Sequence, residues 1–88
     1  MEAYKQEQLS ENTFLRTFRE DIDKYELIWH YDLKDRYMTV ISGLNWMFQF
    51  DDCLPFIMNE GDMIFIPKNT YHRIIKGQGN LIVNIKEN

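Results

Sequence analysis

Twelve residues, Gly61 to His72 (GDMIFIPKNTYH), place the strongest constraint on the fold of this 88-residue chain. Gly61 lies in an expected turn, where a glycine adopts positive φ without a Cβ clash, and the apolar run after it is typical of a β-strand. Pro67 lacks a backbone N–H, so that strand ends there or lies at a sheet edge. A new strand is expected from Tyr71, which places His72 just inside a strand that follows a sharp corner.

The spacing of these residues resembles the second motif of the cupin superfamily, G-x5-P-x-G-x2-H-x3-N. Gly61, Pro67 and His72 occupy three of its five marked positions. Asn69 replaces the second glycine, and asparagine is one of the few side chains that tolerate a left-handed conformation. Lys76 replaces the terminal asparagine. The resemblance implies an all-β protein with a small cupin-type β-barrel (jelly roll), a fold that hosts many functions.

Short segments with a period of two follow residue 24 and support this fold class. We expect strands over residues 25–30, 36–42, 45–50, 54–58, 71–75 and 81–86, in addition to the strand before Pro67. Residues 77–80 are expected to form a hairpin turn. About seven strands without alternating helices predict an all-β barrel or sandwich over residues 25–88.

The first 24 residues have a different pattern. Phe14, Phe18 and Ile22 recur every four residues with Leu15 beside them, which predicts a short amphipathic helix over residues 10–21. We expect residues 1–24 to form an N-terminal helical segment packed on the outside of the barrel. The alternative is a strand over residues 13–18 that extends a sheet edge.

The first cupin motif, G-x5-H-x-H-x3/4-E-x6-G, is degenerate here. Counting back from Gly43, the chain has the pattern H-x-D-x3-R-x6-G, with His30, Asp32 and Arg36 at its marked positions. One histidine position is kept, the second carries a carboxylate, and the acid is replaced by a base. The resemblance over both motifs covers about half of the chain.

Three of these motif positions suggest a metal site. Strand alternation directs His30 and Asp32 to one face, and a barrel brings the strand of His72 alongside them. Two imidazoles and a carboxylate can hold Fe, Mn, Ni or Zn as a divalent cofactor with open positions left over. Arg36 argues against a metal if it points inward to pair with Asp32 or Asp35, because its charge opposes a cation. The direction of Arg36 therefore distinguishes the hypotheses.

The first functional hypothesis is a small cupin-domain protein that binds a divalent metal and a small oxygenated metabolite in the barrel, with isomerase or oxygenase chemistry. The alternative is a metal-free module that binds a small anion at Arg36, for binding or sensing without catalysis. A third hypothesis is an accessory protein that uses the barrel only as a scaffold. Trp46 and Tyr71 are candidates for stacking on a ligand ring, and no catalytic residue is assigned.

Composition limits the partners. A net charge of −4, a pI near 5.0 and the absence of a Lys/Arg run argue against nucleic acid. No apolar run approaches the ~18 residues of a membrane span, and the single Cys53 cannot form an internal disulfide, so we expect a cytoplasmic protein. Because 88 residues bury a small core, we expect a homodimer.

Overall fold

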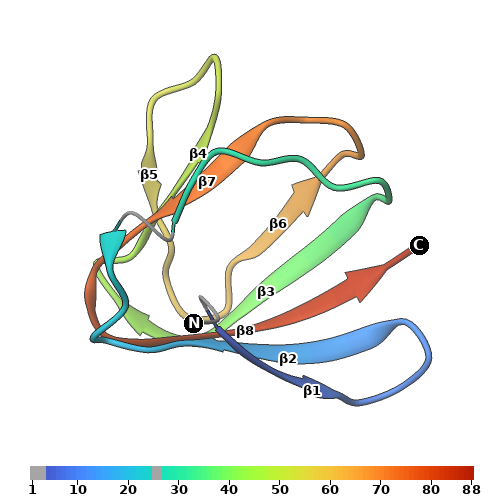
Figure 1. Cartoon of the computed structure of the whole chain (residues 1–88), viewed down its shortest axis with the longest axis horizontal. Coiled ribbons are helices and arrows are strands. Elements are labelled where there is room, and N and C mark those ends of the chain that lie inside the picture. Colours follow the sequence, from blue (N-terminus) through green and yellow to red (C-terminus); the bar gives the residue numbers. More distant parts are fainter. Residues whose placement is uncertain (1–3, 25–26) are drawn as a thin grey trace.

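The computed structural model describes residues 4–24 and 27–88. Within these residues, eight strands form two sheets that face each other and diverge toward one side (Figure 1). The strands are β1 (Lys5–Gln8), β2 (Thr13–Phe18), β3 (Arg36–Leu44), β4 (Met47–Phe50), β5 (Phe56–Ile57), β6 (Met63–Ile66), β7 (His72–Ile75) and β8 (Gln78–Glu87). One sheet has the order β1-β2-β8-β3-β6 and the other β5-β4-β7, and all pairings are antiparallel. The predicted all-β class is confirmed.

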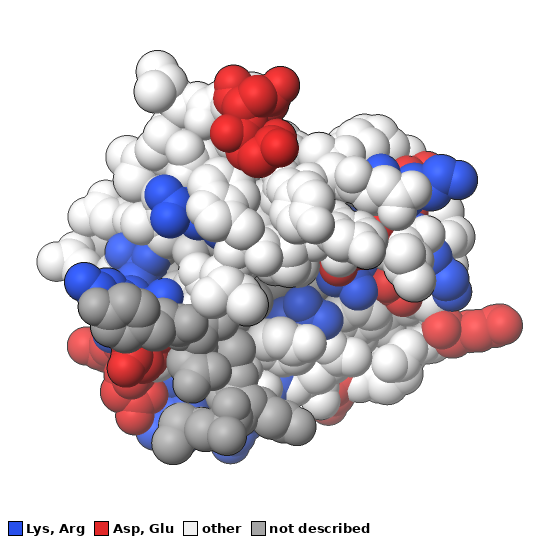
Figure 2. Space-filling view, turned by 45° about the horizontal axis from the view of Figure 1, so that its top comes forward, with Lys and Arg blue, Asp and Glu red and all other residues white. Residues whose placement is uncertain are grey.

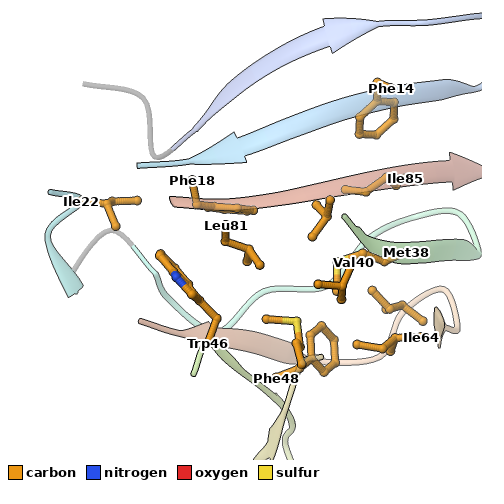
Figure 3. Packing of buried hydrophobic residues seen from close by; sticks show 13 residues of the cluster. Phe14, Phe18, Ile22, Met38, Val40, Trp46, Phe48, Ile64, Leu81 and Ile85 are labelled. Carbon is orange, nitrogen blue, oxygen red and sulfur yellow. The ribbon is translucent and has the colours of Figure 1, made fainter. Parts of the chain in front are cut away.

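The hydrophobic core fills the space between the two sheets (Figure 3). The strands β2, β6 and β8 send alternate side chains inward, and the inward residues of β8, Leu81, Val83 and Ile85, agree with the predicted last strand. The other buried apolar residues are Phe14, Phe18, Ile22, Met38, Val40, Trp46, Phe48, Met58, Ile64 and Ile66.

The predicted N-terminal helix is wrong. No helix occurs in residues 10–21; β1 and β2 form a hairpin, and β2 pairs along its whole length with β8, as the alternative of an edge strand required. Phe14 and Phe18 point inward together with Arg16, which is buried. A charged residue at the central inward position hides the period of two. The open edge of β8 supplies backbone hydrogen bonds that a helix lying on the barrel would leave unused.

Two further predictions need correction. The strand expected over residues 25–30 is reduced, in its described part, to a single bridge between His30 and His72, and Tyr25 and Glu26 lie outside the described residues. Residues 77–80 form no hairpin, because β7 and β8 belong to different sheets. Gly77 instead lies where the chain passes between them. A Cβ on it would meet backbone atoms of Leu44 and Trp46, so the glycine permits a close backbone approach.

The corner before His72 has the conformation that the motif predicts. Gly61 has φ of 89° and Asn69 has φ of 61°, so both residues adopt the left-handed region. The segment before β3 runs beside this corner (Figure 1): the amide of Asn69 donates to the carbonyl of Asp32 at 2.7 Å, and the amide of Lys68 donates to the carboxylate of Asp35 at 2.8 Å. The corner thereby holds the segment that carries Asp32 across the mouth of the barrel.

The surface carries its charges in separate groups. Figure 2 shows one face on which broad uncharged areas lie between groups of charged atoms, and in several of these groups Lys and Arg atoms lie beside Asp and Glu atoms. Within the described part of the chain, no helix has the length and apolar character needed to cross a membrane.

Candidate metal centre

His30, Asp32 and His72 come together at the mouth of the barrel. The two histidines exchange both backbone hydrogen bonds of their bridge, at 3.0 and 2.9 Å, so their side chains lie on one side of the pair. Their ring centroids are 4.4 Å apart. One possible ligand atom from each of the three residues lies within 4.8 Å of the others. The structure therefore brings together all three residues that the sequence nominated as metal ligands.

Both histidine rings present the same nitrogen to the centre. Nδ1 of His30 lies 3.0 Å from the carbonyl oxygen of Ile28, and Nδ1 of His72 lies 2.8 Å from the carbonyl oxygen of Thr70. A carbonyl only accepts a hydrogen bond, so Nδ1 carries the proton in each ring. In the neutral ring, Nε2 then keeps its lone pair. This arrangement is the one that fixes a histidine for metal binding through Nε2.

Asp32 contributes a buried oxygen without a hydrogen-bond partner. Its Oδ1 lies 3.1 Å from Nη1 of Arg36, whereas Oδ2 lies 3.3 Å from Nε2 of His72, without the geometry of a hydrogen bond, and has no partner among the described residues. A buried carboxylate oxygen without a partner is costly. When an imidazole lone pair faces it, a proton or a metal cation between the two atoms removes that cost.

The surroundings keep Asp32 ionised. Burial, the largest single influence, would raise the pKa of its carboxyl, but the close contact with His72 and the charge of Arg36 together outweigh it, so the pKa is lowered from its ordinary value. Asp32 is therefore a carboxylate at neutral pH, which is the form that binds a cation.

His72 is held rigidly in this position. It is 3% exposed, and the ring of Phe48 stacks on it with the centroids 5.4 Å apart and the planes 16° apart. Phe48 is itself part of the core, so His72 is fixed by packing as well as by its bond to Thr70. His30, in contrast, is exposed. The centre has one rigid imidazole at its base and one near the solvent.

Arg36 points inward, against Asp32. Its side chain is 15% exposed, and besides the contact with Asp32 it binds the carboxylate of Glu87 through Nε at 2.9 Å and Nη2 at 2.8 Å. This is the direction that weighs against a metal, since the guanidinium charge opposes a cation. It also leaves little of the Arg36 fork for a ligand anion. However, Glu87 offsets part of that charge, and Arg36 takes only Oδ1 of Asp32.

A cavity of about 290 Å³ opens beside the three residues. Its described lining includes His30, Asp32, Arg36 and His72, together with Tyr4, Arg16, Phe18, Leu27, Ile28, Met38, Phe48, Ile66, Ile74 and Ile85. It has the character of a small-molecule site, with mostly apolar walls and a few converging polar groups. In Figure 2, charged atoms of both signs lie near the centre of the face that is drawn.

The two aromatic candidates lie elsewhere. Neither Trp46 nor Tyr71 is among the described residues that line the cavity. Trp46 is fully buried, and its indole nitrogen lies 3.3 and 3.1 Å from the carbonyl oxygens of Gln78 and Gly79. It is therefore a core residue and does not line the mouth of the barrel. Tyr71 is half exposed, and its ring meets the edge of Tyr31 at 5.0 Å.

Arg16 is a cavity residue that the sequence reasoning missed. It lies on β2, with only 9% of its surface exposed. The available signal was a charged residue at the middle of an otherwise apolar and β-branched segment, 13–18, which is where a strand would place a functional inward side chain.

The donor set fits a divalent transition metal. Two neutral Nε2 atoms and one carboxylate suit zinc, iron, manganese or nickel, with coordination positions left for other ligands. The buried Oδ2 of Asp32, which lacks a partner, is the observation in this structure that favours a cation there. The group could therefore hold a metal ion, against the opposing charge of Arg36.

Comparison with known proteins supports the fold. No protein-family model matches the chain, and no curated protein matches it. An RmlC-like cupin family protein with a double-stranded β-helix fold from Methanocaldococcus jannaschii is similar with a TM-score of 0.69 at 18% identity, over 99% of this chain and 81% of that chain. The resemblance to cupins is thus confirmed at the level of the fold: the chain forms a small cupin-type β-barrel.

Two larger proteins contain a similar barrel. DMSP lyases match with a TM-score of 0.72 at 17% identity, over 85% of this chain and 36% of that chain. FeII HppE matches with a TM-score of 0.69 at 11% identity, over 86% of this chain and 41% of that chain. This chain therefore spans well under half the length of these two neighbours, and the likeness concerns one barrel.

Proposed function

We propose that this chain is a metal-dependent small-molecule-binding cupin that holds one divalent ion through Nε2 of His30, Nε2 of His72 and Oδ2 of Asp32. The observation that carries the proposal is Oδ2 of Asp32, which is buried without a hydrogen bond and faces an imidazole nitrogen whose lone pair is free. A cation between these atoms satisfies all of them at once.

The surrounding residues support metal binding by fixing the ligands in advance. The carbonyls of Ile28 and Thr70 set the proton on Nδ1 of each ring, and Phe48 prevents His72 from turning. Arg36 keeps Asp32 ionised and oriented, at the cost of a weaker attraction for the cation. We therefore expect a moderate affinity that favours nitrogen-preferring ions over magnesium or calcium.

The second part of the proposal is a small oxygenated metabolite in the cavity. The three residues lie in the wall of a cavity of about 290 Å³, so a ligand there reaches the open positions of the ion. A bound divalent ion of this kind polarises a carbonyl or enediolate oxygen or activates dioxygen, which are the steps that an isomerase or an oxygenase needs. Because FeII HppE is similar in fold, iron(II) belongs among the ions to test.

A metal-free anion-binding module remains the alternative, and the inward direction of Arg36 favours it. Arg36 itself already binds Asp32 and Glu87, so it has few donors left for an anion. A ligand anion in a metal-free barrel would need another cation in the cavity wall.

Metal content tests the proposal. We expect protein purified without an affinity tag or chelator to carry close to one equivalent of zinc, iron, manganese or nickel, measured by inductively coupled plasma mass spectrometry. Asp32→Asn should lose that metal, because it replaces the anionic ligand with a neutral amide of the same shape. Asp51→Asn, the same change in an exposed turn, serves as the control and should keep it.

Absence of metal from the wild type, persisting after anaerobic incubation with each ion, would refute the metal-dependent function. Equal metal content in wild type and Asp32→Asn would refute the site. His72→Ala is a weaker test, because removing a buried ring that stacks on Phe48 also disturbs the core.

We also propose that the chain forms the homodimer expected from its sequence. Apolar side chains on the outer face of β3 and β6 are partly exposed, among them Tyr37, Ile41, Met63 and Phe65. A second copy that covered this face would add to the small core of one chain. Light scattering coupled to size-exclusion chromatography measures the oligomeric state directly, and a monomeric mass would contradict this part.

A further inference from the structure

We infer that Arg16 binds an acidic group of the ligand, so that the small molecule in the cavity carries a carboxylate or a phosphate. The inference deepens the proposed function, because it takes the same cavity as the ligand site and names the chemical class of its occupant. It does not depend on the metal, since Arg16 is not one of the nominated ligands.

Arg16 is a buried cation in the wall of the cavity. It is 9% exposed and lies at the central inward position of β2, between Phe14 and Phe18. Its guanidinium carbon lies 3.8 Å from the centroid of the Tyr4 ring and 5.2 Å from that of Phe14. Stacking of this kind fixes the plane of the guanidinium without using its hydrogen-bond donors.

The donors of Arg16 are only partly used. Nε and Nη2 donate to Oε1 of Gln6, at 3.2 and 2.8 Å, and Gln6 is neutral. In residues 4–24 and 27–88, no carboxylate comes within 4.0 Å of this guanidinium. A guanidinium has five N–H donors, so those of Nη1 and one of Nη2 remain for a ligand. Buried arginines are ordinarily paired with an anion, which here has to come from outside the described chain.

The difference between the two cavity arginines strengthens this assignment. Arg36 is neutralised by Asp32 and Glu87, whereas Arg16 has a neutral amide as its partner. Burial is the main cause that lowers the pKa of Arg16 from its ordinary value, and Tyr4, Asp32 and Glu87 only partly oppose it. Two guanidinium groups and the carboxylate of Asp32 line the cavity, and Glu87 balances them from beside it, so a bound divalent ion would create an excess of positive charge there.

The size of the cavity limits the ligand to a small metabolite. About 290 Å³ accommodates on the order of ten water-sized groups at ~30 Å³ each. The forked donors of Arg16 match the paired oxygens of a carboxylate or a phosphate. The apolar walls from Phe18, Ile74 and Ile85 suit a short carbon chain between the acidic group and the rest of the molecule.

The test uses succinate and inorganic phosphate as probes in NMR titrations of metal-free protein, with succinate repeated on zinc-loaded protein. The variants are Arg16→Met, which keeps an unbranched stem and removes the guanidinium and its charge, and Arg16→Lys, which keeps the charge and removes the fork. Arg19→Met is the matched control, because Arg19 is exposed and pairs with Asp21 outside the cavity. The two probes show whether a carboxylate or a phosphate is preferred.

We expect saturable binding of at least one probe to the wild type, with resonances of the cavity residues shifted. Arg16→Met should weaken it at least about tenfold, Arg16→Lys by less, and Arg19→Met should leave it unchanged. If Arg16→Met fails to fold, the wild type supplies a second measurement. The Nε–H resonance of Arg16 should shift with the probe while that of Arg19 stays in place.

Affinity of Arg16→Met within twofold of the wild type, or no saturable binding of either probe up to about 10 mM, would overturn the inference. Its failure is distinguishable from that of the proposed function. A chain that binds succinate through Arg16 but no divalent ion refutes the metal site alone. A chain that takes up the ion without any Arg16-dependent binding of an anion refutes this inference alone.

Discussion

Arg36 binds Asp32 through a single oxygen: Nη1 lies 3.1 Å from Oδ1, and Oδ2 is left facing His72. A pair that used both oxygens would close the site to a cation. Glu87 explains the one-sided contact, because it takes up Nε and Nη2 of the same guanidinium. The arrangement resolves the conflict between an inward arginine and a metal ligand set, since Arg36 can position Asp32 and still leave it one free oxygen.

Replacing Arg36 separates its stabilisation of the folded protein from its repulsion of a bound cation. Arg36→Met leaves Asp32 and Glu87 without their cation, so we expect the free energy of unfolding of the metal-free protein to fall by about 3 kcal/mol in urea titrations. Zinc affinity should rise, on the order of tenfold, because a positive charge beside the ion is removed. Arg19→Met, in an exposed pair with Asp21, should change stability by less than about 1 kcal/mol. Unchanged or weaker zinc binding in Arg36→Met would show that positioning outweighs repulsion.

The stability of the metal-free protein should depend on pH through Asp32. Its pKa is lowered in the folded state, so the stabilisation it provides is fully present above its ordinary value of 3.8 and is lost as pH falls through the lower folded value. We expect the difference in melting temperature between wild type and Asp32→Asn to shrink on acidification below that value. A difference that stays constant over the acid range would contradict the assignment.

The left-handed conformation of Asn69 yields a test of the corner. Asn69 has φ of 61°, a conformation that glycine adopts easily and a β-branched residue does not. We therefore expect the unfolding free energy of Asn69→Gly to stay within about 0.5 kcal/mol of the wild type, and that of Asn69→Val to fall by about 1–2 kcal/mol. Because the amide of Asn69 holds the carbonyl of Asp32, Asn69→Val should also weaken metal binding. Equal stability of the glycine and valine variants would show that the corner tolerates a β-branched side chain.

Local chemistry explains which parts of the fold could be predicted from the sequence. The turn at Gly61, the strand end at Pro67 and the corner at Asn69 depend on backbone preferences of single residues, and the structure confirms them. The position of His72 at the start of β7 was predicted from that corner. The strand β8 could also be predicted from the sequence, because its inward-facing residues are all apolar and occur at every second position.

Long-range pairing explains what could not be predicted. Residues 13–18 fit a helix or a strand by pattern, and the choice was made by the edge of β8, which lies at the other end of the sequence. Arg16 has an inward direction only because of that pairing. The direction of Arg36 depends on Glu87, 51 residues away in sequence. The apolar surroundings of Arg16 in the sequence are a weak local signal of burial, whereas Arg36 has no local signal that distinguishes it from a surface charge.

The most direct measurement is the state of the two histidine rings, observed by long-range ¹H–¹⁵N NMR on the labelled protein during a zinc titration. The chain has only His30 and His72, so the spectrum contains two ring systems, and a His30→Gln variant assigns each to its residue. We predict Nδ1–H tautomers for both rings in the metal-free protein, and displacement of both Nε2 resonances that is complete at one equivalent of zinc. Protonation on Nε2, or Nε2 resonances that stay in place as zinc is added, would contradict a metal centre at His30, Asp32 and His72.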